Sequence, residues 1–281
     1  MCECADVRMC EFFRLIDQKH SHIRTFAHLH ICMLSLYSYH CLMNRKIIIT
    51  QDGSHSIMQT CEFPEPAISK HSHIRTFAHS HISYHSIYGA IQESMHVFID
   101  SGLKPLLHAQ QEVYVFEMGF GTGLNALLTL LYAEKEKKKI YYHTVEAFPL
   151  DNYFVEEINY CTQLNRRDLQ TAFEQLHNSE WSEDITISPY FNLHKANADF
   201  NYYETGKKFH LIYYDAFDPE SQPGLWTLPV FKKLFMMLLP GGSLLTYCSK
   251  GAVRRIMQEA GFAVEKLPGP AHKREIIRAI K

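Results

Sequence analysis

Closely spaced glycines mark the part of the chain most suited to binding a charged ligand. In the stretch 116–125 they have the spacing G-x-G-x-G, and they are Gly119, Gly121 and Gly123. An apolar run precedes them and another follows, which predicts a strand, a turn and a helix. Glycine lets the backbone approach a ligand closely, and the first turn of a helix offers unpaired N–H groups. The pattern predicts a nucleotide-type cofactor site, although a simple tight turn would have the same spacing.

The third glycine of a dinucleotide-binding G-x-G-x-x-G motif is missing, because Leu124 stands at its place. This departure indicates S-adenosyl-L-methionine rather than NAD as the cofactor. An NAD-dependent oxidoreductase remains the alternative at this point. The loop residues expected to bind the cofactor are Gly119, Phe120, Gly121, Thr122, Gly123 and Asn125.

Four acidic residues stand at the ends of successive predicted strands, namely Glu117, Glu146, Asp199 and Asp215. Ligands of open α/β sheets bind along the carboxyl edge of the strands, so these side chains are expected to share one site. We expect Glu117 to face the positive end of the cofactor's amino acid. Glu146 is expected to bind the ribose hydroxyls, and Asp199 the adenine amino group. Each acid taken singly could instead cap a helix.

The loop that begins at Asp215 is the second candidate for chemistry. It contains two prolines and ends at Trp226, one of two tryptophans in the chain. A stiff loop with an acid and aromatic side chains suits a planar substrate held against a cofactor. Phe217 and Trp226 are the expected stacking partners, although Trp226 could equally anchor the following helix.

Strands and helices alternate from Gly89 onward, which predicts an α/β fold. Strands are expected at 112–117, 140–146, 190–196, 209–215 and 243–248, followed by an antiparallel pair at 262–267 and 275–280. Helices are expected at 90–101, 124–138, 149–161, 167–177, 228–239 and 251–260. The expected sheet therefore has seven strands, is mostly parallel and ends in an antiparallel hairpin.

The N-terminal part differs in composition from the rest. Six of the eight cysteines lie at or before Cys61, and the segment 19–28 recurs without change as 70–79. Its His-x-His pairs suggest a metal-binding module as an alternative function. Because no C-x-x-C motif accompanies these pairs, no metal ligand is assigned. We expect 1–42 to be an atypical, poorly ordered segment, 43–103 to carry an insertion at about 61–82, and 104–281 to be the catalytic domain.

Bulk properties exclude few classes of protein. The formal net charge is −2, and the hydrophobic and charged fractions, 46% and 21%, are ordinary for a globular protein. No secretory signal and no long apolar stretch is visible, so we expect a cytoplasmic protein that does not enter a membrane. Basic residues gather toward the C-terminus, which favours a polyanionic partner.

A series of short motifs along the chain resembles the pattern of a known protein family. In chain order they are E-x-G-F-G-T-G-L-N from Glu117, V-E-x-F-P-L from Val145, D-A-F-x-P-x-x-x-P-x-x-W from Asp215, P-G-G-x-L-x-T-Y-C-S from Pro240, V-R-R from Val253, Q-E-A-G-F from Gln258 and K-R-E from Lys273. Together they resemble the methyltransferase domain of the MnmC family, particularly its stand-alone form. The resemblance covers 43–281 apart from the histidine-rich insertion.

This resemblance implies a Rossmann-like methyltransferase that uses S-adenosyl-L-methionine. It implies N-methylation of the aminomethyl group of 5-aminomethyl-(2-thio)uridine at the wobble position of tRNA, with the anticodon stem-loop as partner. Asp215 and Tyr247 are then the expected catalytic residues, and the tRNA-binding residues are expected to be Arg254, Arg255, Lys273 and Arg274. The flavin-dependent oxidase of bifunctional members is expected to be absent, and another amine substrate remains an alternative.

One position departs from the family pattern. Asp218 stands where a small alanine is usual. An inward-facing Asp218 would disfavour ionisation of Asp215, whereas an outward-facing one would be harmless. The sequence leaves both possibilities open.

Overall fold

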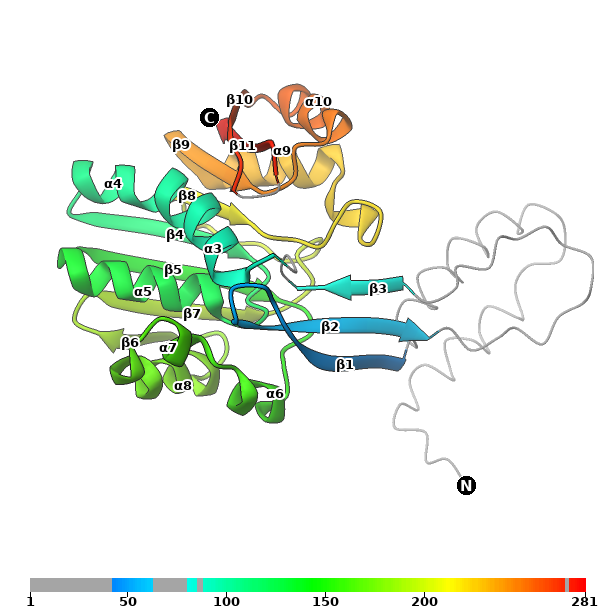
Figure 1. Ribbon diagram of the computed structural model, residues 1–281. Coiled ribbons are helices and arrows are strands. Elements are labelled where there is room, and N and C mark those ends of the chain that lie inside the picture. Colours follow the sequence, from blue (N-terminus) through cyan, green and yellow to red (C-terminus); the bar gives the residue numbers. More distant parts are fainter. Residues whose placement is uncertain (1–41, 63–79, 85–87, 271–272) are drawn as a thin grey trace, which may run out of the picture. The chain divides into compact units, whose positions relative to one another are not determined.

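The computed structural model describes residues 42–62, 80–84, 88–270 and 273–281. Within them are a three-stranded sheet and an eight-stranded sheet (Figure 1). The small sheet has the order β1 (Leu42–Ile49), β2 (His55–Glu62), β3 (Ser80–Ser83). The large sheet has the order β10 (Ala263–Pro268), β11 (Glu275–Ile280), β9 (Leu238–Thr246), β8 (Phe209–Tyr214), β4 (Glu112–Met118), β5 (Lys139–Glu146), β7 (Phe191–Asn197), β6 (Asp184–Ser188).

The centre of the large sheet is parallel, as the alternating pattern predicted. Strands β9, β8, β4, β5 and β7 pair in parallel, and β10 and β11 form the predicted antiparallel hairpin beside β9. The prediction of seven strands was wrong, because β6 adds an eighth, antiparallel to β7. This five-residue edge strand has no buried residue, and so it lacks the apolar run that revealed the central strands.

Helices cover both faces of the sheet (Figure 1). One face carries α3 (Ala90–Ser94), the π-helical segment η1 (Met95–Leu103), α4 (Lys104–Ala109), α5 (Leu124–Glu136), α7 (Tyr160–Gln163), η2 (Arg167–Leu169) and α8 (Gln170–Asn178). The other face carries α9 (Leu228–Met237) and α10 (Gly251–Glu259). Two further short helices are α6 (Asn152–Glu157) and η3 (Pro223–Leu225). No helix in these described ranges is both long and apolar enough to span a membrane.

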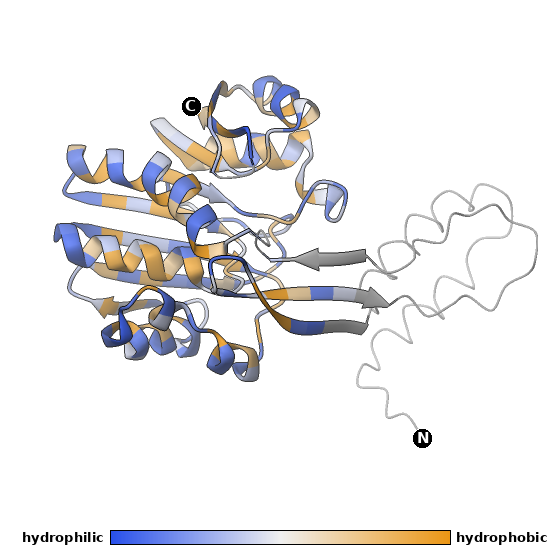
Figure 2. Cartoon of the chain, viewed as in Figure 1, coloured by the Kyte–Doolittle hydropathy of each residue, from blue (hydrophilic) through white to orange (hydrophobic). Residues whose placement is uncertain are grey.

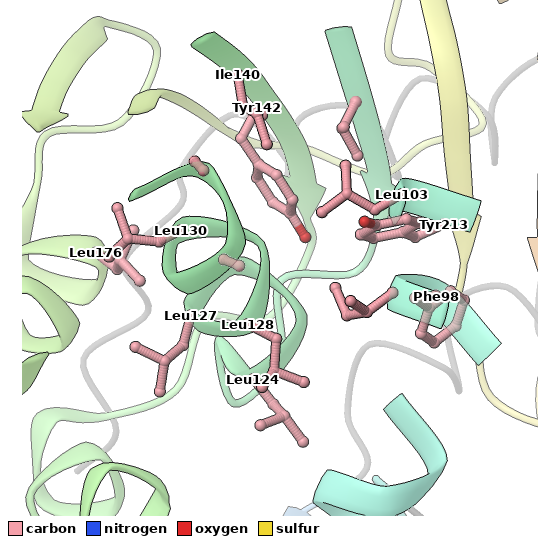
Figure 3. Close-up of a cluster of buried hydrophobic side chains, with 14 of the residues drawn as sticks. Phe98, Leu103, Leu124, Leu127, Leu128, Leu130, Ile140, Tyr142, Leu176 and Tyr213 are labelled. Atoms are coloured by element: carbon pink, nitrogen blue, oxygen red, sulfur yellow. The ribbon is translucent and has the colours of Figure 1, made fainter. Parts of the chain in front are cut away.

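The apolar sides of these helices form two cores, one on each face of the sheet. In the first, leucines of α5 such as Leu124 and Leu128 lie near Phe98 of η1 and Tyr213 of β8 (Figure 3). Helix α9 is mostly apolar, whereas the carboxyl end of α5 is hydrophilic (Figure 2). This packing fixes the amino end of α5 against the carboxyl edge of the sheet, where the glycine turn lies.

Several helix boundaries differ from the predictions, and three of these differences affect the description of the fold. The helix predicted to end at residue 101 continues through η1 and α4 to Ala109, and it therefore crosses the expected domain boundary at 103/104. The helix predicted over 149–161 is interrupted at Ile158, whose backbone is extended. The helix predicted to reach Leu239 ends at Met237, because Leu238 is already the first residue of β9.

The expected N-terminal organisation is only partly described. Residues 1–41 and 63–79, which hold most of the expected atypical segment and insertion, lie outside the described residues. The end of the expected insertion is a strand, because β3 pairs with β2 from Ser80 to Ser83. Arg45 of β1 donates hydrogen bonds to the carbonyl oxygens of Phe148 and Pro149, at 2.9 and 3.1 Å. The small sheet therefore contacts the loop that follows β5.

Candidate active site

The predicted glycine turn joins β4 to α5 at the carboxyl edge of the sheet. Gly119, Gly121 and Gly123 have φ of +84°, +50° and +72°, which is the left-handed region that favours glycine. The turn is held from the neighbouring strand, because the amide of Gly119 donates to the Val145 carbonyl at 3.0 Å. The backbone of the loop is thus fixed, and its three glycines add no side chains of their own.

A histidine that the sequence did not reveal supports this turn from behind. His177 of α8 lies against Gly123 and the Phe120 ring, with its Nε2 3.2 Å from the Thr122 carbonyl oxygen. The Phe120 side chain is buried there, so only its backbone faces the site. Thr122 is also buried and accepts a hydrogen bond from the Tyr160 hydroxyl at 2.9 Å. Phe120 and Thr122 were both expected to bind the cofactor, and they can therefore contact it only through their backbone groups.

Gly123→Ala is expected to destabilise the fold. A Cβ at this position would lie 2.7 Å from His177 Nε2, and φ is positive. Left-handed backbone alone costs an L-residue roughly 1–2 kcal/mol, so we expect a loss of about 2 kcal/mol or more in the free energy of unfolding. Denaturant unfolding measures it. Gly206→Ala is the matched control, since nothing lies within 4 Å of its Cβ; equal effects for the two variants would contradict the account.

Glu117 is the most enclosed acid of the site. It lies at the end of β4, is only 1% exposed, and its Oε2 has no hydrogen-bond partner. Burial raises the pKa of this carboxyl well above its ordinary value, and the nearby charges of Asp215 and Glu146 raise it further. A buried carboxyl without a cationic partner is unfavourable, so its position indicates a positively charged ligand.

The next two acids make local hydrogen bonds. Glu146 Oε2 accepts a hydrogen bond from the Gly121 amide at 3.0 Å, and Oε1 accepts one from the Phe148 amide at 2.8 Å. Glu146 thus holds the glycine turn and its own loop together, in addition to the ribose contact expected from the sequence. Asp199 lies two residues beyond β7 and accepts hydrogen bonds from Asn201 through Oδ1.

Asp215 follows β8 and meets the glycine turn. Its Oδ2 accepts a hydrogen bond from Asn125 Nδ2 at 2.9 Å, so the first turn of α5 and the end of β8 are joined. Burial, with a contribution from the negative charge of Glu93, raises the pKa of Asp215 from 3.8 to about 7, while Asn125 and Lys273 oppose the shift. A carboxyl that titrates near neutral pH is suited to accept a proton.

The predicted stacking role of Trp226 was wrong. The indole is 4% exposed and packs edge-on against Tyr214. Its Nε1 donates a hydrogen bond to the Phe217 carbonyl at 2.7 Å, which anchors the loop after Asp215. Tyr247 has a similar function, since its hydroxyl donates to the Ala216 carbonyl at 2.9 Å. Burial and the charge of Asp215 raise the pKa of Tyr247, so it remains protonated and is not a proton acceptor.

The Phe217 side chain is partly exposed, and its ring contacts a tyrosine that the sequence analysis did not single out. Its ring meets Tyr84 edge-to-face, with centroids 5.0 Å apart. Tyr84 also touches the glycine turn, because a Cβ at Gly121 would lie 3.2 Å from its Cδ1. This tyrosine therefore links the cofactor turn to the loop after Asp215. It follows the histidine-rich stretch, where no motif distinguished it.

Asp218 is directed away from Asp215. Its carboxylate pairs with Lys250 at 3.0 Å, and the same lysine pairs with Glu220 at 2.8 Å. The departure from the family pattern is thus the outward-facing case.

The four basic residues predicted to bind tRNA do not form one group. Arg255 on α10 and Arg274 before β11 are exposed. Arg254 is half-buried, and its Nε has no hydrogen-bond partner. Lys273 instead points toward the site, where it pairs with Glu93 of α3. Glu93 was missed because an acid in the first turn of a helix is ordinary at a helix start.

The site residues fit S-adenosyl-L-methionine. The Oε2 atom of Glu117 and the Oδ1 atom of Asn125 are buried acceptors without hydrogen-bond partners, and they lie beside a turn whose glycines carry no side chains. Glu117 would hold the ammonium of the cofactor's amino acid, and Glu146 its ribose. Among the described residues no group of three His, Cys, Asp or Glu could hold a metal ion. The His-x-His pairs lie within or at the edge of segments outside the description.

Comparisons with known proteins also indicate S-adenosyl-L-methionine as the cofactor. Residues 156–281 match a family described as S-adenosyl-L-methionine-dependent methyltransferase. A bifunctional protein MnmC of tRNA 5-methylaminomethyl-2-thiouridine biosynthesis from Campylobacter hominis is 28% identical over 192 residues, 66% of this chain and 28% of its own. The protein of the same name from Actinobacillus pleuropneumoniae is 26% identical over 220 residues, 69% of this chain and 31% of its own.

A solved structure shares the fold. The crystal structure of MNMC2 from Aquifex aeolicus matches with a TM-score of 0.62 and 18% identity, over 96% of this chain and 82% of that one. The chain spans about a third of the length of the curated relatives, and the match falls on their methyltransferase half. The chain therefore has a Rossmann-like methyltransferase fold, it is similar to MnmC proteins over their methyltransferase half, and its site fits S-adenosyl-L-methionine.

Proposed function

We propose that the chain transfers a methyl group from S-adenosyl-L-methionine to the aminomethyl group of 5-aminomethyl-(2-thio)uridine at the tRNA wobble position. The product is the 5-methylaminomethyl form. The observation that supports this most is Asp215, a carboxyl with a pKa raised to about 7, held by Asn125 next to the glycine turn. The names of the relatives add support, because they place those proteins in the biosynthesis of a methylaminomethyl nucleoside.

The chemistry of an amine acceptor explains what Asp215 must do. A primary alkylamine has a pKa near that of lysine, about 10, so it arrives as an ammonium ion without a free lone pair. The ionised Asp215 accepts its proton, and the nitrogen lone pair then forms the new N–C bond. The cofactor supplies a methyl group on a sulfonium, whose C–S electrons remain on sulfur. Because a carboxylate also stabilises the ammonium, placement in line with the methyl group is as important as proton removal.

A flipped-out wobble base would lie beside Phe217, since Trp226 is enclosed. Base–aromatic stacking is tolerant of base identity, and the aminomethyl group would then be distinguished by the charged groups near Asp215. As part of this proposal, the protein acts in the cytoplasm and binds the anticodon stem-loop.

The exposed basic positions on α10 and before β11 are proposed to contact tRNA phosphates. We expect Arg255→Glu with Arg274→Glu to weaken tRNA binding and to lower the salt slope by about 1 for each lost contact. Filter binding at several salt concentrations measures both quantities. Lys135→Glu, on an exposed position of α5, is the matched control. An unchanged salt slope in the double variant would remove the phosphate role.

Methyl transfer to a defined tRNA tests the proposed function. The full chain is incubated with labelled S-adenosyl-L-methionine and tRNA carrying 5-aminomethyl-uridine, and the wobble nucleoside is isolated. We expect label in that nucleoside and none in tRNA with an unmodified wobble uridine. Equal labelling of both tRNAs, or of neither, would refute the substrate named here.

A further inference from the structure

A lysine of the chain lies close to the loop that begins at Asp215. It contacts Tyr247, whose hydroxyl donates a hydrogen bond to the carbonyl of Ala216, the residue after Asp215. The Lys273 ammonium pairs with the Glu93 carboxylate, and the Lys273 and Glu93 side chains are only 32% and 12% exposed. The same ammonium lies over the Tyr247 ring, 4.4 Å from its centroid. A carboxylate and an aromatic face together are a standard way to bind an alkylammonium ion.

The charges of this pair reach Asp215. The negative charge of Glu93 raises the pKa of Asp215, whereas the positive charge of Lys273 lowers it. Among the residues that the structure describes, Asp215 also interacts electrostatically with Asn125, Glu117, Tyr142, Tyr160 and Tyr247. Within this set, Lys273 is the one cation, and it is chemically the same group as a protonated aminomethyl substituent.

We propose that Glu93 and the Tyr247 ring form an alkylammonium subsite beside Asp215, which Lys273 fills until the substrate ammonium displaces it. The inference rests on the proposed function for the identity of the substrate, but the subsite itself is defined by these three side chains. Displacement keeps Glu93 paired at every stage, so the carboxylate never loses its cation. It also makes Lys273 a competitor of the substrate rather than a phosphate ligand.

Occupation of the subsite by Lys273 weakens the apparent affinity for the substrate ammonium, because only the fraction of protein with an open subsite can bind it. Lys273→Met should therefore open the subsite, and Glu93→Gln should remove its charge. The second change also lowers the pKa of Asp215, since a neighbouring negative charge is lost. If the ion pair between Lys273 and Glu93 only stabilised the fold, neither Lys273→Met nor Glu93→Gln would bind an amine more tightly.

Binding of n-propylammonium chloride to the full chain, loaded with S-adenosylhomocysteine, tests the subsite without tRNA. We expect Lys273→Met to bind this ion about tenfold more tightly than the unchanged chain, by ligand-observed NMR. The double variant, Lys273→Met with Glu93→Gln, should not show this tighter binding of n-propylammonium. The uncharged n-propanol should not bind more tightly to Lys273→Met than to the unchanged chain. Lys250→Met is the matched control, because Lys250 is also paired with acids, Asp218 and Glu220, but lies outside the subsite.

Lys273→Gln, checked for folding by circular dichroism, serves as the second variant. If neither Lys273 variant binds n-propylammonium better than the unchanged chain, the subsite is refuted. With aminomethyl tRNA, Lys273→Met should lower KM and Glu93→Gln should raise it, with Glu93→Asp restoring part of the loss. A raised KM in Lys273→Met would also overturn the proposal. Amine binding without any methylation of tRNA would refute the proposed function while the subsite stands.

Discussion

Asp215→Asn is expected to slow methyl transfer strongly while making the protein more stable. An amide keeps the shape of the carboxyl and can still pair with Asn125, but it cannot take up the substrate proton. Proton transfer by a placed side chain contributes about 10²–10⁴-fold to a rate, so we expect a loss in kcat of that size. Single-turnover transfer of label to aminomethyl tRNA measures it. Asp218→Asn, at the neighbouring acid held outward by Lys250, should retain activity.

The gain in stability follows from the raised pKa of Asp215. Between pH 3.8 and about 7 the folded protein holds a proton that the unfolded chain has lost, so stability falls as the pH rises through this window. Above it the full cost is present, with an upper limit of about 4 kcal/mol. Asp215→Asn removes this cost, and thermal unfolding at pH 8 should show a higher Tm, with little difference at pH 4. A lower Tm at pH 8 would contradict the burial assigned to Asp215.

Glu117→Gln is expected to weaken binding of S-adenosyl-L-methionine by about 10- to 100-fold, since a hydrogen bond to a charged group contributes about 1.5–3 kcal/mol. In the free protein burial raises the pKa of Glu117, and a bound ammonium would favour the ionised form. Cofactor binding should therefore release a proton, and affinity should increase with pH. Calorimetry in buffers of different ionisation heat measures this release.

Two further results are expected of the Glu117→Gln variant, and one outcome would count against the role of Glu117. The glutamine variant should bind the cofactor without the proton release. It should be no less stable than the unchanged chain, because a buried carboxyl without a cationic partner is replaced by a neutral amide. Unchanged affinity would show that Glu117 does not face the cofactor. Glu112→Gln, at the exposed start of the same strand β4, is the matched control.

The parts of the fold that sequence could predict are those with a strong local pattern. The buried strands β4, β5 and β8 are nearly continuous apolar runs, and each ends close to an acid that the structure places at one edge. The glycine turn was predictable because its conformation demands residues without a Cβ. The closing hairpin of β10 and β11 was found from two short runs with proline and glycine between them.

The rest depends on contacts between distant segments. Whether Trp226 stacks on a substrate or anchors a loop is decided by Tyr214 and the Phe217 carbonyl, not by its neighbours in sequence. Lys273 has the sequence context of a phosphate ligand, yet Glu93, far away in the chain, draws it into the site. His177 likewise supports the glycine turn from another helix, and no local motif records it.

The pH dependence of single-turnover methyl transfer to the wobble nucleoside tests the central claim most directly. We expect label in 5-methylaminomethyl-uridine, with a rate that rises through an apparent pKa near 7 as Asp215 ionises. Removing the nearby negative charge with Glu93→Gln should move that pKa lower. A rate independent of pH between 6 and 8, or an unmoved profile in the variant, would contradict the assignment of Asp215 as the group that receives the amine's proton.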